Sequence, residues 1–187
     1  MMDFSCVRIV DPYVDKGWTP EIRLTLATPE EVDSAETELG CNLPAGYRDY
    51  VTTFGLGEYC SYIRIDMPSA LLSEYKNYQR FLDEYWFWDL GKGILTKQRA
   101  IESIKFGGTD IGDTLIFHPT NPGEIFVLPR QDDMLYKIGT DLYEVIDWLC
   151  TDHSYPTGFV GEEHRLQYFV PHNPFAYTHG RIRPENI

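Results

Sequence analysis

The sequence is poor in basic residues and contains no long apolar run. Its 187 residues include 16 Lys and Arg against 29 Asp and Glu, a formal net charge of -13 at pH 7. A field of that sign repels phosphate backbones, so we expect no direct binding of DNA or RNA. The chain lacks a stretch of about 18 apolar residues, which predicts no membrane-spanning helix. Its first residues lack the basic and apolar parts of a signal peptide, and this favours a cytoplasmic protein.

Cysteine is scarce and never paired at close spacing. The four cysteines are Cys6, Cys41, Cys60 and Cys150, and no CxxC motif occurs. In a cytoplasmic chain we expect them to be reduced thiols that pack as small apolar groups. Structural zinc requires four close ligands, which this spacing does not supply. We therefore predict no metal and no cofactor.

Apolar and aromatic residues are abundant enough for a folded core. Hydrophobic types make up 43% of the chain, with 13 Tyr, 10 Phe and 4 Trp. The length is typical of one domain. We predict a single domain over residues 1–187 with a core at about 20–150, and an extension over 151–187 that docks on it. Aromatic residues of this extension favour docking: they lie in segment 166–170 and at Phe175 and Tyr177.

Two helices are predicted near the start of the core. Thr28 and Glu31 form a capping box with Pro29 at the first helical position, and Gly40 is a natural left-handed stop. The apolar stripe of this first helix is Val32, Ala35 and Leu39. A second helix is predicted from Pro44 to Gly55, and the two should form a helical hairpin. Its stripe is Tyr47, Tyr50, Val51 and Phe54.

The rest of the core reads as strands between two further helices. We predict a strand at 59–65, a helix at 68–85, a strand-like aromatic segment at 86–88, and strands at 114–118, 124–128 and 134–138. Short turns between the last three strands predict an antiparallel meander. A last helix, capped by Thr140, should face it with Leu142, Val145, Ile146 and Leu149. Without βαβ alternation, this order predicts an α+β fold, an antiparallel meander with helices packed on one face.

In order and spacing, these motifs resemble the SUKH superfamily, which includes fungal cell-wall assembly regulators and bacterial toxin-immunity proteins. The resemblance covers roughly residues 20–150. The matching motifs are Leu39-Gly40, Leu43-Pro44, Phe54-Gly55, the Gly-Asp strand at 111–117, the strand at 124–127 and the helix at 142–149. It implies an α+β fold without catalytic residues. For bacterial members it also implies binding to a cognate toxin, often a nuclease.

Catalytic motifs are absent from the sequence. It contains no GxSxG, HExxH or phosphate-loop pattern, so we predict that the protein is not an enzyme. His118 and Gly112-Asp113 fit turns beside strands. The glycine pairs at 91–93 and 107–108 fit tight turns better than anion sites. A hydrolase with paired histidines and carboxylates stays the weakest alternative.

One stretch has the composition of a protein-binding surface. Acidic residues flank large aromatics between 83 and 89, and two further acids fall in a loop between strands. The candidate partner-binding residues are Asp83, Glu84, Trp86, Trp88, Asp89, Asp132 and Asp133. Tryptophan provides rigid contact area, and acids can pair with a basic partner. Alternatively, alternate rings fill the core, with Trp86 and Trp88 on one side and Phe87 on the other.

These observations favour a protein that binds another protein. We expect an immunity-type protein that neutralises a toxin domain, in particular a basic nuclease, by steric cover and complementary charge. The alternative is a regulatory scaffold that binds a cellular protein, as the fungal relatives suggest. The oligomeric state is left open by the sequence.

Overall fold

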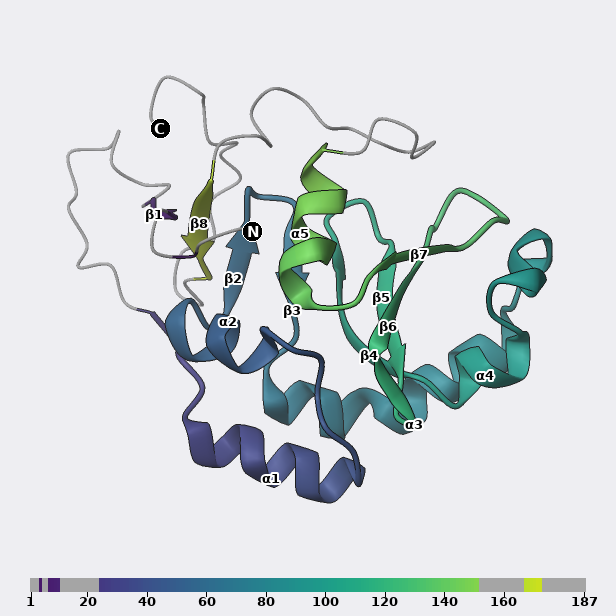
Figure 1. Ribbon diagram of the computed structural model, residues 1–187, viewed down its shortest axis with the longest axis horizontal. Helices are drawn as coiled ribbons and strands as arrows, with labels where there is room; N and C mark the ends of the chain where they lie inside the picture. The colour runs from purple at the N-terminus through teal and green to yellow at the C-terminus, as the bar shows by residue number, and fades with distance from the viewer. Residues whose placement is uncertain (1–3, 5–6, 11–23, 152–166, 173–187) are drawn as a thin grey trace.

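One mixed sheet organises the structure (Figure 1). The computed structural model describes residues 4, 7–10, 24–151 and 167–172. In these ranges eight strands lie in the order β1-β8-β2-β3-β4-β5-β6-β7. Their bounds are β1 Arg8–Ile9, β2 Gly57–Tyr59, β3 Ile63–Ile65, β4 Ile104–Thr109, β5 Thr114–His118, β6 Asn121–Leu128, β7 Tyr136–Gly139 and β8 Tyr168–Pro171. β1 pairs with β8 in parallel, and all other neighbours are antiparallel.

Helices cover this sheet on both faces. They are α1 Pro29–Leu39, α2 Tyr47–Thr53, α3 Pro68–Glu84, the 3₁₀-helix η3 Asp89–Gly93, α4 Lys97–Ile101 and α5 Leu142–Thr151. The predicted α+β class is confirmed. Of the helices in the described ranges, none combines the length and the apolar character that crossing a bilayer requires.

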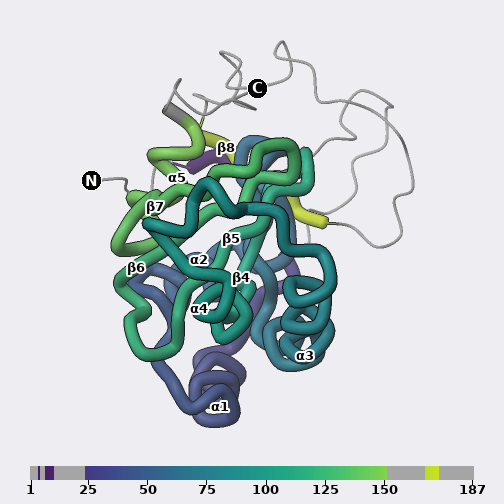
Figure 2. The backbone as a smooth tube through the Cα atoms, turned by 90° about the vertical axis from the view of Figure 1, so that its right-hand side faces the viewer, coloured from purple at the N-terminus to yellow at the C-terminus, as the bar shows by residue number. Residues whose placement is uncertain are grey.

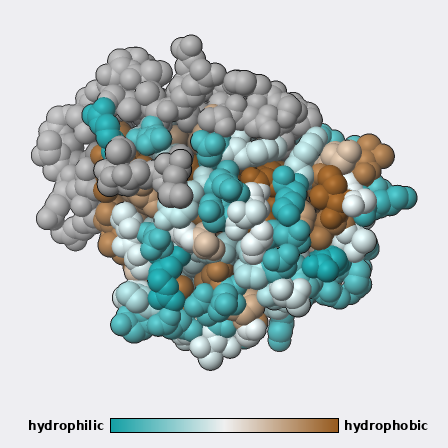
Figure 3. Space-filling model, in the orientation of Figure 1, coloured by the Kyte–Doolittle hydropathy of each residue, from teal (hydrophilic) through white to brown (hydrophobic). Residues whose placement is uncertain are grey.

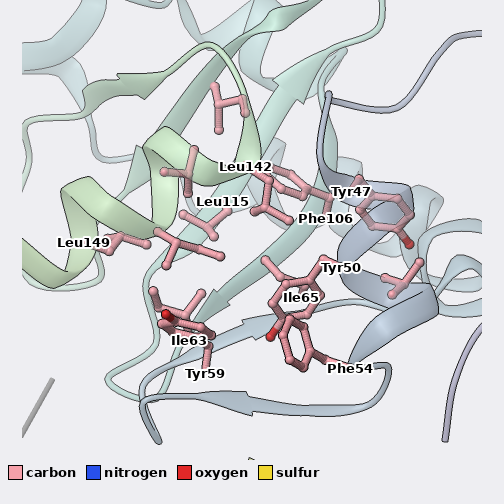
Figure 4. Close-up of a cluster of buried hydrophobic side chains, with 14 of the residues drawn as sticks. Tyr47, Tyr50, Phe54, Tyr59, Ile63, Ile65, Phe106, Leu115, Leu142 and Leu149 are labelled. Atoms are coloured by element: carbon pink, nitrogen blue, oxygen red, sulfur yellow. The ribbon is translucent and has the colours of Figure 1, made fainter. Parts of the chain in front are cut away.

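The core has two parts because β5 and β6 bury both of their faces. Leu115 and Phe117 join a cluster with residues of α2 and α5 (Figure 4), whereas Ile116 lies in a second cluster with residues of α3 and α4. Figure 2 shows α5 and α3 on opposite sides of these strands. The prediction of helices on one face is therefore incomplete. A run of apolar residues in consecutive positions, such as 115–117, is typical of a strand buried on both sides.

The first helix forms as its local sequence predicts. Thr28 Oγ1 accepts from the Glu31 amide, the Glu31 carboxylate accepts from the Thr28 amide at 2.7 Å, and Gly40 ends the helix with φ 69°. Leu39 is only half-buried, so its packing is weaker than its place in the stripe predicts. The second helix begins at Tyr47, after a left-handed Gly46, and not at Pro44.

The segment 59–65 is a hairpin and not the single strand that its composition predicts. β2 and β3 are joined by a turn in which Cys60 and Ser61 both have positive φ, 52° and 50°. Hairpin turns of this kind usually contain Gly or Asn. Neither is present here, so the sequence pattern gives no warning of the turn.

The predicted three-stranded meander is confirmed and is extended by β4. Gly107 and Gly108, expected in a tight turn, lie within β4, where a Cβ at either position would meet a backbone oxygen, of Arg64 at 2.6 Å and of Asp113 at 2.4 Å. Helix α4, capped by Thr96, was not predicted. All four predicted α5 core residues are buried, but the side chain that caps this helix belongs to Asp141, whose carboxylate accepts from the Glu144 amide.

Part of the C-terminal extension docks on the core. Strand β8 lies between β1 and β2, with Phe169 paired to Tyr59 and fully buried. The segment 166–170, which was expected to dock, thus contributes residues to strand β8 at Tyr168–Pro171. Phe175 and Tyr177 lie outside the described residues, so docking of the extension as a whole stays a prediction.

Candidate functional site

Large apolar side chains are exposed mainly at one end of the molecule. Of seven such residues in the described ranges, five lie between positions 81 and 94: Phe81, Tyr85, Phe87, Leu90 and Ile94. Tyr85 is 61% and Leu90 65% exposed. We call these five residues the apolar end. Figure 3 shows apolar residues at the right-hand edge, over the segment that follows α3 in Figure 1.

The last turns of α3 supply the first part of the apolar end. Leu82 points into the core, whereas Phe81 lies on the outer side of the helix. The Phe81 and Tyr85 rings are neighbours, with centroids 5.4 Å apart, because residues four apart share a helix face. The Tyr85 amide closes the helix on the Phe81 carbonyl at 2.9 Å. The helix therefore presents an aromatic ridge as it ends.

The aromatic segment at 86–88 is not a strand but leads into η3. Trp88 is 3% exposed, and its indole N–H donates to the Pro129 carbonyl at 2.7 Å. Phe87 stacks on Trp88 with centroids 4.0 Å apart, and the Trp86 ring meets Trp88 edge-on at 5.5 Å. Trp88 is thus a core residue. This corrects its prediction as a direct partner contact: it supports the surface from beneath.

Loop 129–135 between β6 and β7 packs against this segment. A Cβ at Gly91 would lie 2.4 Å from Cγ of Leu135, so η3 and the loop are in close contact. Figure 2, which faces this end, shows the two chain segments side by side. The structure therefore brings the predicted acids of the loop, Asp132 and Asp133, to the same end as residues 83–89.

The predicted acids at this end differ in how they are held. Asp83 pairs with Lys97 at 3.1 Å, and Asp89 accepts from the Trp86 indole at 3.0 Å. Both carboxylates are exposed, as are those of Glu84 and Asp133.

Asp132 has a structural role in the loop. One carboxylate oxygen accepts from the Met134 amide at 3.0 Å and the other from the Tyr136 hydroxyl at 2.9 Å. Burial, together with this hydrogen bond and the nearby acids, raises the pKa of Tyr136 to about 12. Asp132 is therefore held by the protein itself, and Asp133 is the outward-facing acid of the pair.

The five residues of the apolar end were not among the predicted site residues. Phe81 could have been found, because the predicted helix at 68–85 turns it away from the side that carries Leu71 and Leu82. Tyr85 lies three residues after Leu82, nearer to that side, so helical spacing alone does not mark it as exposed. For Leu90 and Ile94 the sequence gives a weaker indication that the side chains are exposed. They lie in a glycine-flanked segment whose turn structure the sequence alone does not fix.

Two polar clusters elsewhere have local structural roles. Asp113 accepts from the Thr109 hydroxyl at 2.9 Å and the Arg130 amide at 3.0 Å, which fixes the turn at Gly112 as predicted. His118 Nδ1 lies 2.8 Å from Thr120 Oγ1 and also accepts from the Thr120 amide, while Nε2 is 3.4 Å from Glu102. The Thr120 amide and the Thr120 hydroxyl both contact Nδ1 of His118. The imidazole therefore stabilises the hairpin turn.

The cysteines are placed as packing groups where the structure describes them. Cys60 and Cys150 are buried free thiols and Cys41 is half-buried, whereas Cys6 lies outside the described residues. The hydrogen bond that the Cys150 thiol donates to Cys60, together with burial, raises the pKa of Cys150. Within the described part of the chain, no group of three or more His, Cys, Asp or Glu could hold a metal ion.

Helix α1 forms an acidic surface that is separate from the apolar end. Its eleven residues contain five acids and no base. Arg48 of α2 bonds to the carboxylates of Asp33 and Glu36, and Glu36 also accepts from the Leu43 amide at 2.8 Å. A shallow depression beside these groups is lined by Asp33, Glu36, Thr37, Gly40, Cys41 and Asn42.

Comparison with known proteins identifies the family. Residues 26–148 match the SMI1 / KNR4 family (SUKH-1), a span that runs from the segment before α1 to within α5. No curated protein matches the sequence. The match covers well over half of the chain and contains the apolar end together with the acidic helix α1. The protein therefore belongs to the SMI1 / KNR4 family (SUKH-1).

Proposed function

We propose that this SUKH-1 protein is a non-catalytic immunity protein of the cytoplasm. In this proposal it binds a cognate bacterial toxin domain, a basic nuclease, and blocks the surface that the nuclease uses for its substrate. Membership of the family supports a role in protein binding, because bacterial proteins of the SUKH superfamily include toxin-immunity proteins. The observation that carries the proposal is the net charge of -13.

Excess negative charge suits a partner that must itself bind phosphates. Folding gains nothing from such an excess, since like charges repel one another in the compact state. On α1, Arg48 neutralises Asp33 and Glu36 only in part, and Glu30 and Glu38 stay exposed without a base on their own helix. Attraction between such a surface and a basic nuclease can raise the association rate constant towards about 10⁸ M⁻¹s⁻¹ at low salt.

Inhibition by cover requires no reactive group in the inhibitor. The most enzyme-like cluster in the described residues is Thr120, His118 and Glu102, and it forms a hairpin turn. An acidic protein that occupies a nuclease's phosphate-binding surface excludes nucleic acid by both volume and charge. The proposed inhibition therefore requires a tight complex and no catalytic turnover by the inhibitor.

Binding to the toxin domain encoded beside this protein tests the proposal. The full chain and a catalytically inactive variant of that domain would be mixed, and rate constants measured by surface plasmon resonance from about 50 to about 500 mM NaCl. We expect a complex whose association slows steeply as salt rises, and loss of nuclease activity when active toxin is used.

Failure to form a complex with any neighbouring toxin domain at low salt would overturn the proposal. The regulatory scaffold would then be favoured if a purified housekeeping protein bound instead and the gene had no toxin neighbour. Turnover in a substrate screen would contradict the non-catalytic role.

A further inference from the structure

We propose that the apolar end is the surface that holds the partner, and that its counterpart is an apolar patch bordered by Lys and Arg on the toxin domain. This inference rests on the proposed function and specifies where and how the toxin binds. The centre of this surface consists of Phe81, Tyr85, Phe87, Leu90 and Ile94. The rim of the surface contains Glu84, Asp89 and Asp133.

Concentration of exposed apolar groups supports the assignment. Single apolar residues scattered on a surface are normal, but several at one end are typical of an interaction site. Outside the apolar end, the large hydrophobics exposed in the described ranges are Ile9 and Leu26. Three of the five residues carry large, rigid rings, and Leu90 is the most exposed residue of the set at 65%. Such side chains gain most when a partner removes them from water.

The apolar end is held in place before any partner binds. Trp88 anchors the segment to the carbonyl of Pro129, and the absence of a side chain at Gly91 lets η3 contact Leu135. Phe87 stacks directly on the buried Trp88 ring. A surface fixed by core contacts loses little conformational entropy on association, which favours tight binding.

Charge around the apolar end indicates the chemistry of the partner's rim. Glu84, Asp89 and Asp133 are exposed acids, while Asp83 is paired with Lys97. Lys92 is the exposed base within η3. Acids therefore predominate at the rim, and Lys or Arg on the partner would complement them. Rim charges mainly affect association, whereas buried apolar contacts mainly affect dissociation.

Two pairs of substitutions and a control separate these contributions. In the full chain, Leu90→Ala with Ile94→Ala should weaken toxin binding at least about 30-fold, chiefly through faster dissociation. Glu84→Lys with Asp133→Lys should slow association about 3- to 10-fold at low salt and leave dissociation nearly unchanged. Leu26→Ala removes a comparably exposed residue beside Gly55 and should change neither rate.

The results distinguish this inference from the proposed function. If the wild type binds the toxin domain and the Leu90/Ile94 variant binds equally well, the surface assignment is overturned and the function stands. If the wild type binds no toxin, the function itself fails. Light scattering tests a second copy as occupant: a wild-type dimer that this variant converts to a monomer would also overturn the assignment. Unchanged far-ultraviolet circular dichroism shows that each variant is folded.

Discussion

Trp88 and Pro129 are 41 residues apart in the chain and are joined by a buried hydrogen bond of 2.7 Å from the indole N–H to the carbonyl oxygen. Proline has no amide hydrogen, so Pro129 cannot both donate and accept backbone hydrogen bonds as a paired strand residue does. The bond fixes the segment after α3 to the loop after β6. The apolar end and the predicted acidic loop are neighbours for this reason.

Trp88→Phe should destabilise the protein by about 2–4 kcal/mol. The substitution leaves the Pro129 carbonyl without its buried donor and also removes ring volume from the core. Trp86→Phe is the matched control, since its indole donates to an exposed Asp89 carboxylate, and we expect a loss below about 1 kcal/mol. Urea unfolding followed by circular dichroism measures both. Equal losses in the two variants would contradict the anchoring role of Trp88.

Gly91→Ala should destabilise the protein by about 1–3 kcal/mol, because the new methyl group would overlap Leu135. Two atoms of Leu135 lie within 2.8 Å of the Cβ position, and one of them is the backbone nitrogen. Gly93→Ala, two residues on, has nothing within 4 Å and should be neutral or slightly stabilising. Thermal unfolding of the two variants side by side checks this. A stable Gly91→Ala variant would mean that η3 moves freely against the loop.

The first helix could be predicted because its capping residues act on the nearby backbone. Elements without such residues could not be predicted in this way. Thr28, Glu31 and Gly40 are capping groups whose effect depends on nearby backbone alone. The turn at Cys60 and Ser61 has no such residue and is imposed by the pairing of β2 with β8 and of β3 with β4. The sequence pattern therefore predicts one strand where the structure has two.

Residues 86–88 show a second reason for error. The run of three aromatic residues predicted a strand-like segment with alternating side chains, and the alternation is present, with Phe87 exposed and Trp88 buried. A short irregular segment can bury every other side chain as a strand does, so period alone does not distinguish them. The acids of the candidate site were visible in the sequence, but its exposed apolar residues depended on how η3 packs.

Tyr78→Phe should be neutral or raise stability by up to about 1 kcal/mol. The Tyr78 hydroxyl is buried and has no hydrogen-bond partner among the described residues, so its removal relieves a desolvation cost. Tyr47→Phe is the contrasting variant. Its hydroxyl donates to the Asp66 carbonyl at 2.8 Å, and the loss should be about 1–2 kcal/mol. The free energies of unfolding of the two variants test this prediction. A large loss of stability in Tyr78→Phe would show that the hydroxyl has a hydrogen-bond partner.

Alkaline pH should weaken the fold in part through Tyr136. Burial, followed by the hydrogen bond to Asp132, raises the folded-state pKa of Tyr136 to about 12, above an ordinary value of about 10. Its contribution is fully present below about pH 10 and is lost as pH rises through about 12, because the unfolded state ionises first. Relative to Tyr136→Phe, the wild type should therefore lose stability over this interval. A constant difference in unfolding free energy between the two proteins would contradict the raised pKa.

Asp132→Lys and Asp133→Lys carry the same charge change at adjacent positions but should differ in effect. Asp132 accepts from the Met134 amide and the Tyr136 hydroxyl, so its replacement breaks two bonds in the loop that supports η3. We expect a loss of about 1–3 kcal/mol in urea unfolding, and weaker toxin binding as a secondary result. Asp133 is exposed and should change stability by less than about 0.5 kcal/mol while slowing association at low salt. The two positions therefore separate a carboxylate that holds the surface from one that faces the partner, and equal stability of the two variants would refute the distinction.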